Sequence, residues 1–151
     1  MSRYGTAFDL WRAASPDWNA YTRHAFVEGL RDGTLPRAAF LHYLAQDYVF
    51  LKHFSRAWGL AIAKADTLPE MEACAATVHG LLHHEMSLHV QICAQAGIDA
   101  NTLRTTPEHP GNMAYTRYVL EAGYSGDFLD LLAALAPCVL GYGELGARLG
   151  S

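Results

Sequence analysis

Hydrophobic residues along this chain recur at steps of three, four and seven positions, which is the spacing of an α-helix that buries one face. The pattern is clearest from Pro36 to about Asp66, where Phe40, Leu44, Leu51 and Phe54 would share one face. No stretch alternates between polar and apolar residues over a length that would make a β-strand. The sequence therefore predicts an all-α fold class, with the helices packed as a bundle.

Turn and capping residues set the predicted ends of these helices. Ser15-Pro16-Asp17 is typical of a helix start, Asp32-Gly33 is typical of a helix end, and Thr34 can cap the helix that follows. Gly97 is expected to end a later helix, and the polar segment after it is expected to be a loop. The predicted helices cover about residues 2–11, 16–32, 36–66, 68–96, 113–122 and 127–149, and the predicted loop covers residues 99–112.

The last predicted helix, residues 127–149, is apolar around nearly its whole circumference. Such a helix is expected at the centre of a bundle rather than on its surface. The chain stops directly after it at Gly150-Ser151, which leaves few helices to surround it. We therefore expect further helices beyond this chain, or another subunit, to cover it; a small complete bundle is the alternative.

Composition narrows the class of protein. A chain of 151 residues with 51% hydrophobic residues fits one folded domain, residues 1–151, and excludes wholesale disorder. Eleven Lys and Arg against fifteen Asp and Glu give a net charge of −4, and no basic block is present, so nucleic acid is not an expected partner.

Compartment is predicted from the cysteines and from the apolar runs. No uninterrupted apolar run approaches the roughly 20 residues of a membrane span, and the N-terminus lacks the pattern of a signal peptide. Cys74, Cys93 and Cys138 form an odd set without metal-ligand spacing. Reduced thiols in a cytoplasmic protein are therefore expected, with no membrane contact.

Pro137-Cys138 stands inside the last predicted helix, where proline removes one backbone hydrogen bond at a cost of about 3 kcal/mol. If the helix restarts there, Cys138 lies beside free N–H groups, which lower the pKa of its thiol and make it a usable nucleophile. The alternative is a small core residue beside a kink. Tyr142 follows one turn later between Gly141 and Gly143, which indicates close helix packing or a cavity.

Asp47 is a carboxylate within an aromatic stripe, because Tyr43, Asp47, Phe50 and Phe54 fall on one side of the predicted helix. A buried carboxylate needs a partner. A slot lined by rings, with one acceptor, suits a flat heterocycle that carries an amino group. The alternative is an aspartate hydrogen-bonded to Tyr or His at the helix surface.

The histidine-rich segment from His79 to His89 raises the question of metal binding. Its pairs, His79 with His83 and Glu85 with His89, are four residues apart, whereas carboxylate bundles that hold two irons use Glu-x-x-His. His84 to His89 has one residue too many for His-Glu-x-x-His. We therefore expect no metal and no cofactor here, and a structural or supporting hydrogen-bonding role. Serine hydrolase, phosphate-loop and dinucleotide motifs are absent from the sequence.

Four segments occur in the order FLHYLAQDYVFLKHF, HHEMSLH, NMAYTRYV and LAALAPCVLGYGELG. In that order they resemble the TenA family, the thiaminase II group of bacterial thiamin salvage proteins, along nearly the whole chain. The resemblance implies a haem-oxygenase-like helical fold and a homo-oligomer, commonly a tetramer. It also implies a hydrolase whose substrate is an aminopyrimidine compound or thiamin.

The resemblance further implies roles for individual residues. Asp47 matches the aspartate that binds the edge of a 4-amino-5-substituted pyrimidine, and Phe50 matches an aromatic that packs on the ring. Cys138 matches the nucleophile, and Tyr115 and Tyr142 match tyrosines of the same pocket.

Two further positions, Glu85 and His89, resemble a family signature and are assigned a supporting role. In the family, a thiolate adds to the pyrimidine ring and helps to expel a group from the attached methylene, which water then replaces. A second catalytic carboxylate, a glutamate, and a further pocket tyrosine are expected beyond Ser151, so weak or no turnover is expected from this chain alone. Two alternatives stay open, a non-catalytic pyrimidine-binding or regulatory protein and a di-iron oxygenase of the same fold.

Overall fold

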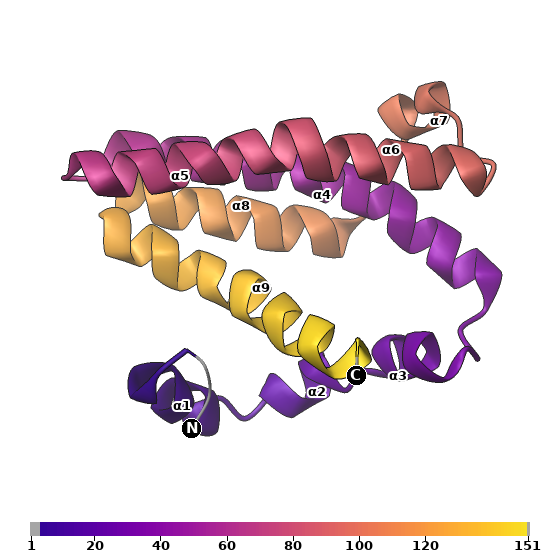
Figure 1. The fold of residues 1–151 in the computed structure, drawn as a ribbon, viewed down its shortest axis with the longest axis horizontal. Helices are drawn as coiled ribbons and strands as arrows, with labels where there is room; N and C mark the ends of the chain where they lie inside the picture. Colours follow the sequence, from indigo (N-terminus) through magenta and orange to yellow (C-terminus); the bar gives the residue numbers. More distant parts are fainter. Residues whose placement is uncertain (1–3, 151) are drawn as a thin grey trace. The chain divides into compact units, whose positions relative to one another are not determined.

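The computed structural model describes residues 4–150, and all regular secondary structure within them is helical, as the sequence predicts (Figure 1). Residues 2 and 3 of the first predicted helix lie outside the described residues. The helices are α1 (Thr6–Ala14), α2 (Trp18–Thr22), α3 (Ala25–Asp32), α4 (Arg37–Lys64), α5 (Leu68–Gly80), the π-helical turn η1 (Leu81–Glu85), α6 (Met86–Gln95), α7 (Ala100–Thr105), α8 (Pro110–Ser125) and α9 (Phe128–Leu149). The chain divides into two compact units, residues 37–139 and residues 1–36 with 140–151, which are described separately.

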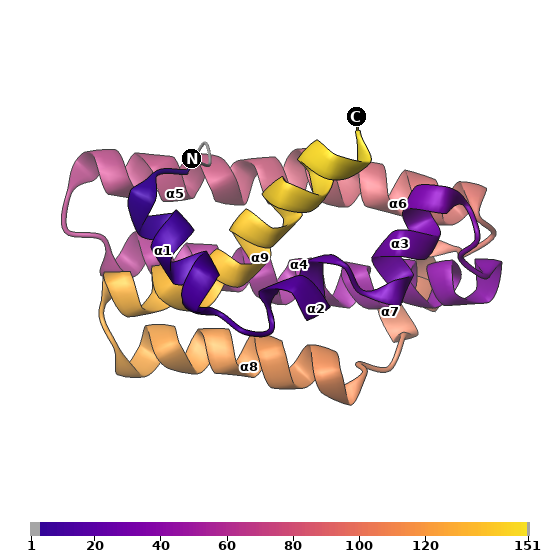
Figure 2. The same cartoon turned by 90° about the horizontal axis from the view of Figure 1, so that it is seen from below.

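In the unit formed by residues 37–139, α4 packs against α5 and α6 on one side and against α8 on the other (Figure 2). Side chains from α4, α5, α8 and α9 meet in its main core. Small residues on α4 allow this close approach, since Ala57 is 1% exposed and Ala61 is 0% exposed. Larger aliphatic groups from α9 fill the space around them, including Leu131 and Leu135.

A second, smaller core joins α4, α6 and α7 around Leu44, Cys93 and Leu103. Helix α7 lies within residues 99–112, so the prediction that this whole segment is a loop is wrong. Asp99 caps α7 by accepting a hydrogen bond from the backbone N–H of Thr102, and α7 then buries Leu103. This short helix exists because a capping residue and one buried leucine compensate for a weak helical pattern.

Two other predicted boundaries are wrong for reasons of local hydrogen bonding. The helix expected from residue 16 to residue 32 is broken into α2 and α3, because His24 starts a new helix by accepting a hydrogen bond from the N–H of Phe26. Thr34 does not serve α4 as predicted; its hydroxyl bonds the carboxylate of Asp32 at 2.6 Å. The predicted end at Gly33 is confirmed, with the left-handed φ of 77° that glycine tolerates.

The segment predicted as one helix from residue 68 to residue 96 has the expected ends but contains the π turn η1. An α-helix turns by about 100° per residue, so Leu81 and Leu88, seven positions apart, would share a face. The π turn inserts one extra residue and rotates the following helix by about one position. As a result His89 and Cys93 face inward, at 8% and 0% exposure, while Leu88 is 57% exposed.

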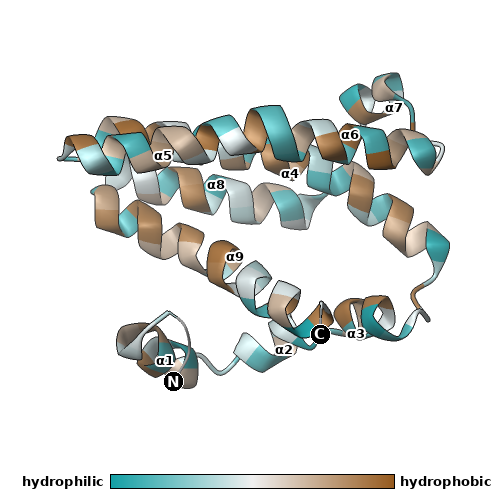
Figure 3. Cartoon of the chain, in the orientation of Figure 1, coloured by the Kyte–Doolittle hydropathy of each residue, from teal (hydrophilic) through white to brown (hydrophobic). Residues whose placement is uncertain are grey.

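Helix α9 is long and apolar, as its brown colour over much of its length indicates (Figure 3). It is the one helix among residues 4–150 that passes a test of length and composition for crossing a membrane, a test that core helices also pass. Helix α9 is buried on one face only, so it is not surrounded on all sides as a helix at the centre of a bundle would be. Leu131 is 0% exposed on that face, whereas Leu129 is 70% exposed and Val139 is 41% exposed.

In the other unit, ion pairs tie the end of α9 to the N-terminal helices. Glu144 accepts hydrogen bonds from the Arg12 guanidinium at 2.7 and 2.8 Å and from the Trp18 indole at 2.9 Å. Arg148 pairs with Glu28 at 2.7 Å. Gly141 lies directly against the ring of Tyr21, where a Cβ would clash, so the close packing predicted from the glycines is confirmed.

The main core predicts a large loss of stability when Leu131 is truncated. Leu131→Ala removes a side chain with 0% exposure and leaves a cavity between α4, α8 and α9. The expected loss in the free energy of unfolding, measured by urea denaturation, is about 2–5 kcal/mol. The matched control is Leu129→Ala, two residues earlier and 70% exposed, which is expected to change stability by no more than about 0.5 kcal/mol.

Candidate functional site

Asp47, on the buried side of α4, faces His89 of α6. The Nδ1 atom of His89 lies 3.4 Å from Oδ2 of Asp47, and its Nε2 atom lies 2.6 Å from the backbone oxygen of Leu44. Both side chains are shielded, with 17% exposure for Asp47 and 9% for His89. The alternative of an aspartate paired with a histidine is therefore what the contacts show, although the pair is largely buried rather than on the surface.

Burial raises the pKa of Asp47 from 3.8 to about 6. The positive charge that His89 can carry opposes this rise, and the negative charge of Glu85, at the end of the π turn, adds to it. Carboxylates of ordinary pKa are fully ionised at neutral pH, whereas Asp47 is poised to gain and lose a proton close to physiological pH.

Cys138 shares this electrostatic environment. Burial, and then the charges of Asp47 and Glu85, together raise the pKa of its thiol from 9.0 to about 12. The three groups come from α9, α4 and η1, which are far apart in the sequence. The structure thus brings Cys138 close enough to Asp47 and Glu85 for their charges to act on its sulfur.

The hypothesis that α9 restarts at Pro137 and so lowers the pKa of Cys138 is wrong. Helix α9 runs unbroken from Phe128 to Leu149 with Pro137 inside it. Cys138 therefore lies in the interior of α9, and burial together with the charges of Asp47 and Glu85 raises the pKa of its thiol instead of lowering it.

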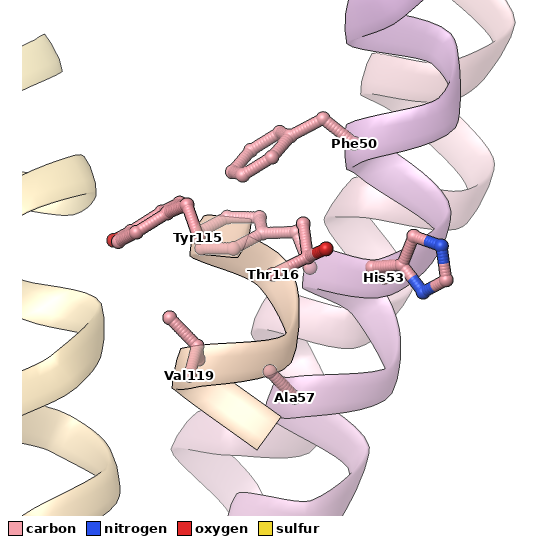
Figure 4. Close-up of a pocket in the computed structure, with 7 residues that line it drawn as sticks. Phe50, His53, Ala57, Tyr115, Thr116 and Val119 are labelled. Carbon is pink, nitrogen blue, oxygen red and sulfur yellow. The ribbon is translucent and has the colours of Figure 1, made fainter. Parts of the chain in front are cut away.

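Phe50 and Tyr115 form a stacked pair between α4 and α8, with ring centroids 6.2 Å apart and an interplanar angle of 13°. They line a small pocket together with Phe54, Thr116 and Val119, and Figure 4 shows the two rings one above the other with Thr116 turned toward His53. The Tyr115 hydroxyl donates a hydrogen bond to the backbone oxygen of Ala134 at 3.1 Å. That bond ties α8 to α9 one turn before Cys138.

Two aromatic candidates remain, Tyr43 and Tyr142. Tyr43 packs beside Phe40 in the smaller core, at a ring distance of 6.4 Å, so the predicted aromatic stripe divides between two clusters. Tyr142 is 48% exposed and belongs to the unit of residues 1–36 and 140–151, whereas Asp47, Phe50, Tyr115 and Cys138 belong to the unit of residues 37–139.

Gln46 is a positioning residue that sequence analysis did not single out. Its side chain donates to the backbone oxygen of Pro107 at 2.8 Å and accepts from the backbone N–H of His109 at 2.9 Å. Asn112 in turn donates to the backbone oxygen of Gln46 at 2.9 Å. These bonds fix the start of α8, and hence the helix that carries Tyr115, against the residue beside Asp47. An amide next to a candidate carboxylate was the available signal.

The histidines of the segment from His79 to His89 do not gather into a metal site. Rings of His79 and His83 approach to 4.6 Å on the exposed side of α5 and η1, while His89 points inward. Residues 4–150 contain no group of three or more His, Cys, Asp or Glu side chains placed to hold a metal ion.

These observations define an all-helical protein in which a buried carboxylate, a thiol and two stacked rings come from α4, α8 and α9. The chain belongs to the TENA/THI-4/PQQC family, whose model matches residues 11–151. It is 35% identical over 143 residues to the aminopyrimidine aminohydrolase of Halalkalibacterium halodurans, an alignment that covers 95% of this chain and 64% of that protein.

Two solved structures share the haem-oxygenase-like helical fold of this family. A TenA family protein of Silicibacter sp. TM1040, described as a transcription regulator, is 65% identical with a TM-score of 0.95, covering 97% of this chain and 66% of that one. A TenA homologue of Pyrococcus horikoshii is 26% identical with a TM-score of 0.90, covering 97% and 69%. The chain spans about two thirds of the length of these three relatives.

The raised pKa of Asp47 predicts a pH dependence of stability. Because the folded-state pKa is about 6 and the ordinary value is 3.8, the folded protein holds the Asp47 proton at pH values where the unfolded chain has lost it. The contribution of Asp47 to stability is therefore greatest at low pH and declines as the pH rises from about 4 to about 6.

Asp47→Asn is expected to remove this decline, because the amide does not ionise. The measurement is the urea midpoint at intervals between pH 4 and pH 7. Asp66→Asn, at an exposed position between α4 and α5, controls for the loss of one carboxylate and is expected to leave the decline in place. An unchanged pH dependence in Asp47→Asn would contradict the assignment.

Proposed function

We propose that this protein hydrolyses an aminopyrimidine compound in thiamin salvage, with Cys138 as the nucleophile and Asp47 as the recognition carboxylate. Membership of the TENA/THI-4/PQQC family and similarity to an aminopyrimidine aminohydrolase support this proposal. The observation that carries it is the shared environment of Cys138 and Asp47, in which the carboxylate charge acts on the thiol.

Asp47 is suited to the edge of a 4-aminopyrimidine. That edge presents an amino donor and a ring nitrogen acceptor side by side, and a protonated carboxyl presents one donor and one acceptor in the matching order. The pKa of Asp47, raised to about 6 by burial, makes this protonated form accessible near neutral pH. Phe50 and Tyr115 offer a flat apolar surface of the kind on which heterocycles pack.

The proposed reaction proceeds through a covalent adduct. The sulfur of Cys138 bonds to a ring carbon while a proton reaches the ring nitrogen. The electrons of that nitrogen then expel the leaving group, protonated as an amine, from the methylene attached to the ring. Water adds to the methylene, the bond between carbon and sulfur breaks, and the aromatic ring and the thiol are restored.

The high pKa of Cys138 imposes a condition on this reaction. A free thiolate is rare when the thiol pKa is about 12, so attack on the ring has to coincide with transfer of the thiol proton to a nearby base. Asp47 holds its proton for the ring nitrogen in this scheme, so Glu85 is the candidate base of the two carboxylates whose charges act on the sulfur. A bound, electron-poor ring that carries positive charge would also lower the pKa of the thiol.

The second candidate is a pyrimidine-binding protein without turnover. A neutral, buried thiol at Cys138 favours it, and the similar Silicibacter protein is described as a transcription regulator. Binding requires Asp47 and the ring pair but makes no demand on the thiol. The two candidates therefore differ in what Cys138 contributes.

The first test measures turnover. The chain is incubated with a 4-amino-5-aminomethylpyrimidine, and released ammonia is measured. Cys138→Ser is expected to lower the rate by roughly a hundredfold or more, because a hydroxyl is a far weaker nucleophile than a thiol. Cys74→Ser, a buried thiol on α5 to which no role is assigned, is the matched control and is expected to retain the rate. Binding with the same low rate of ammonia release in Cys138→Ser as in the unaltered protein would instead support the second candidate.

The second test measures binding by calorimetry with the Cys138→Ser variant, so that turnover does not interfere. Asp47→Ala is expected to weaken binding by roughly tenfold, since alanine supplies neither the donor nor the acceptor that the edge of the ring needs. Asp66→Ala is the control. Equal affinity of Asp47→Ala and the unaltered site would rule out Asp47 as the recognition group.

A further inference from the structure

His89 makes two contacts that together restrict where its protons lie. Its Nε2 atom is 2.6 Å from the backbone oxygen of Leu44. A carbonyl oxygen only accepts hydrogen bonds, so Nε2 must carry a hydrogen in both the neutral and the charged forms of the ring. The tautomer of neutral His89 is thereby fixed, with the lone pair on Nδ1.

That lone pair faces Asp47, whose Oδ2 atom is 3.4 Å from Nδ1. If both groups are without a proton, a lone pair opposes a carboxylate in a shielded place, which is unfavourable. One proton on either partner makes the contact attractive, as an imidazolium beside a carboxylate or as a carboxyl beside a neutral ring. The geometry therefore favours one proton held by the pair as a whole.

The other titratable groups that interact with Asp47 do not supply that proton readily. Glu85 of the π turn is a further negative charge, which favours protonation of the pair. Cys93 of α6 and Cys138 of α9 are thiols whose pKa values are raised by burial and by Asp47 itself. Among the groups of residues 4–150 that shift the pKa of Asp47, His89 is the cation.

The π turn is what places His89 at this position. In an unbroken α-helix, Leu88 and Ile92 would follow Leu81 on the inner face, seven and eleven residues on. With the π turn, His89 and Cys93 take that face instead. Leu88 and Ile92 are left 57% and 37% exposed, so the helix gives up burial of two apolar side chains to turn a histidine toward Asp47. Such turns occur often at functional sites.

We propose that His89 is a positioning residue, set in place by the π turn, that shares one proton with Asp47 and so sets the pH range in which Asp47 can pass it to the ring nitrogen of the bound pyrimidine. This inference rests on the proposed function for the identity of the acceptor. When sulfur adds to the ring, the proton moves from the pair to the ring nitrogen, and His89 stays neutral with its hydrogen on Nε2. When the ring becomes aromatic again, the proton returns to the pair.

The first experiment uses the unaltered, ligand-free protein and needs no variant. Side-chain ¹⁵N shifts of His89 and the ¹³Cγ shift of Asp47 are followed by NMR from pH 4 to pH 9. The expected result is that Nε2 keeps its hydrogen throughout, and that the Asp47 carboxyl keeps its proton well above the ordinary range of an aspartate. A neutral form with the hydrogen on Nδ1, or an Asp47 carboxyl that ionises at its ordinary pKa, would overturn the proposal.

Two substitutions then separate the two nitrogens of His89. His89→Gln places an amide N–H near the position of Nε2 but no group at Nδ1, and His89→Asn places an N–H near Nδ1 but leaves the Leu44 oxygen without its donor. Loss of the cation in His89→Gln is expected to raise the Asp47 midpoint by about 1 pH unit. His83→Gln, on the exposed side of the π turn, is the control and is expected to leave the midpoint unchanged.

Deletion of Leu82, which is 46% exposed, tests the role of the π turn. The shortened segment is expected to form a continuous α-helix with Leu88 inward, to keep its helical circular dichroism, and to show the Asp47 midpoint of His89→Gln. A folded deletion variant with unaltered coupling between His89 and Asp47 would refute the placement by the π turn. If the deletion prevents folding, the titration of the unaltered protein still decides the pairing.

These readouts are independent of ligand and turnover, so the two proposals fail separately. If His89 and Asp47 are coupled but the protein binds no 4-aminopyrimidine, the proposed function is contradicted and the pairing of His89 with Asp47 still stands. If binding and turnover have the same pH profile in His89→Gln as in the unaltered protein, the role of His89 is contradicted and the proposed function still stands. A profile displaced toward higher pH in His89→Gln, with His83→Gln unchanged, is the expected result.

Discussion

Shielding of the Asp47 carboxylate from water is the constraint on which the rest of the site depends. An ionised carboxylate in such a place is costly unless a cation or hydrogen-bond donors compensate. Here the compensation comes from His89, 3.4 Å away, while Glu85 opposes it. The raised pKa of Asp47 follows from keeping this carboxylate on the inner side of α4, and its charge adds to the burial that raises the pKa of the Cys138 thiol.

The helical class of the fold and most helix ends were predictable, because apolar spacing and glycine or capping residues are local signals. Gly33 and Gly97 illustrate this, since both take positive φ values where the sequence predicts that a helix ends. The interior of the segment from residue 68 to residue 96 was not predictable in this way. Both Leu88 and His89 fit a helical face, and the choice between them depends on the packing against α4, which lies far away in sequence.

The same distinction applies to the candidate site. Asp47, Phe50, Tyr115 and Cys138 were identifiable as unusual residues, and the structure places them on neighbouring helices of one unit. The electrostatic state of Cys138 was not identifiable, because it depends on an unbroken α9 and on carboxylates from α4 and η1. The contribution of Gln46 was hidden for a similar reason, since its partners lie about sixty residues away.

Leu88 and Ile92 acquire a different meaning once the π turn is recognised. Exposed aliphatic side chains on a helix commonly suggest a surface that awaits a binding partner. In this helix they are the side chains that an unbroken α-helix would bury. Burial of each would stabilise the fold by roughly 1.5–3 kcal/mol. In related chains, an exposed leucine followed directly by an inward-facing histidine would therefore indicate a π turn that serves the site rather than the packing of the core.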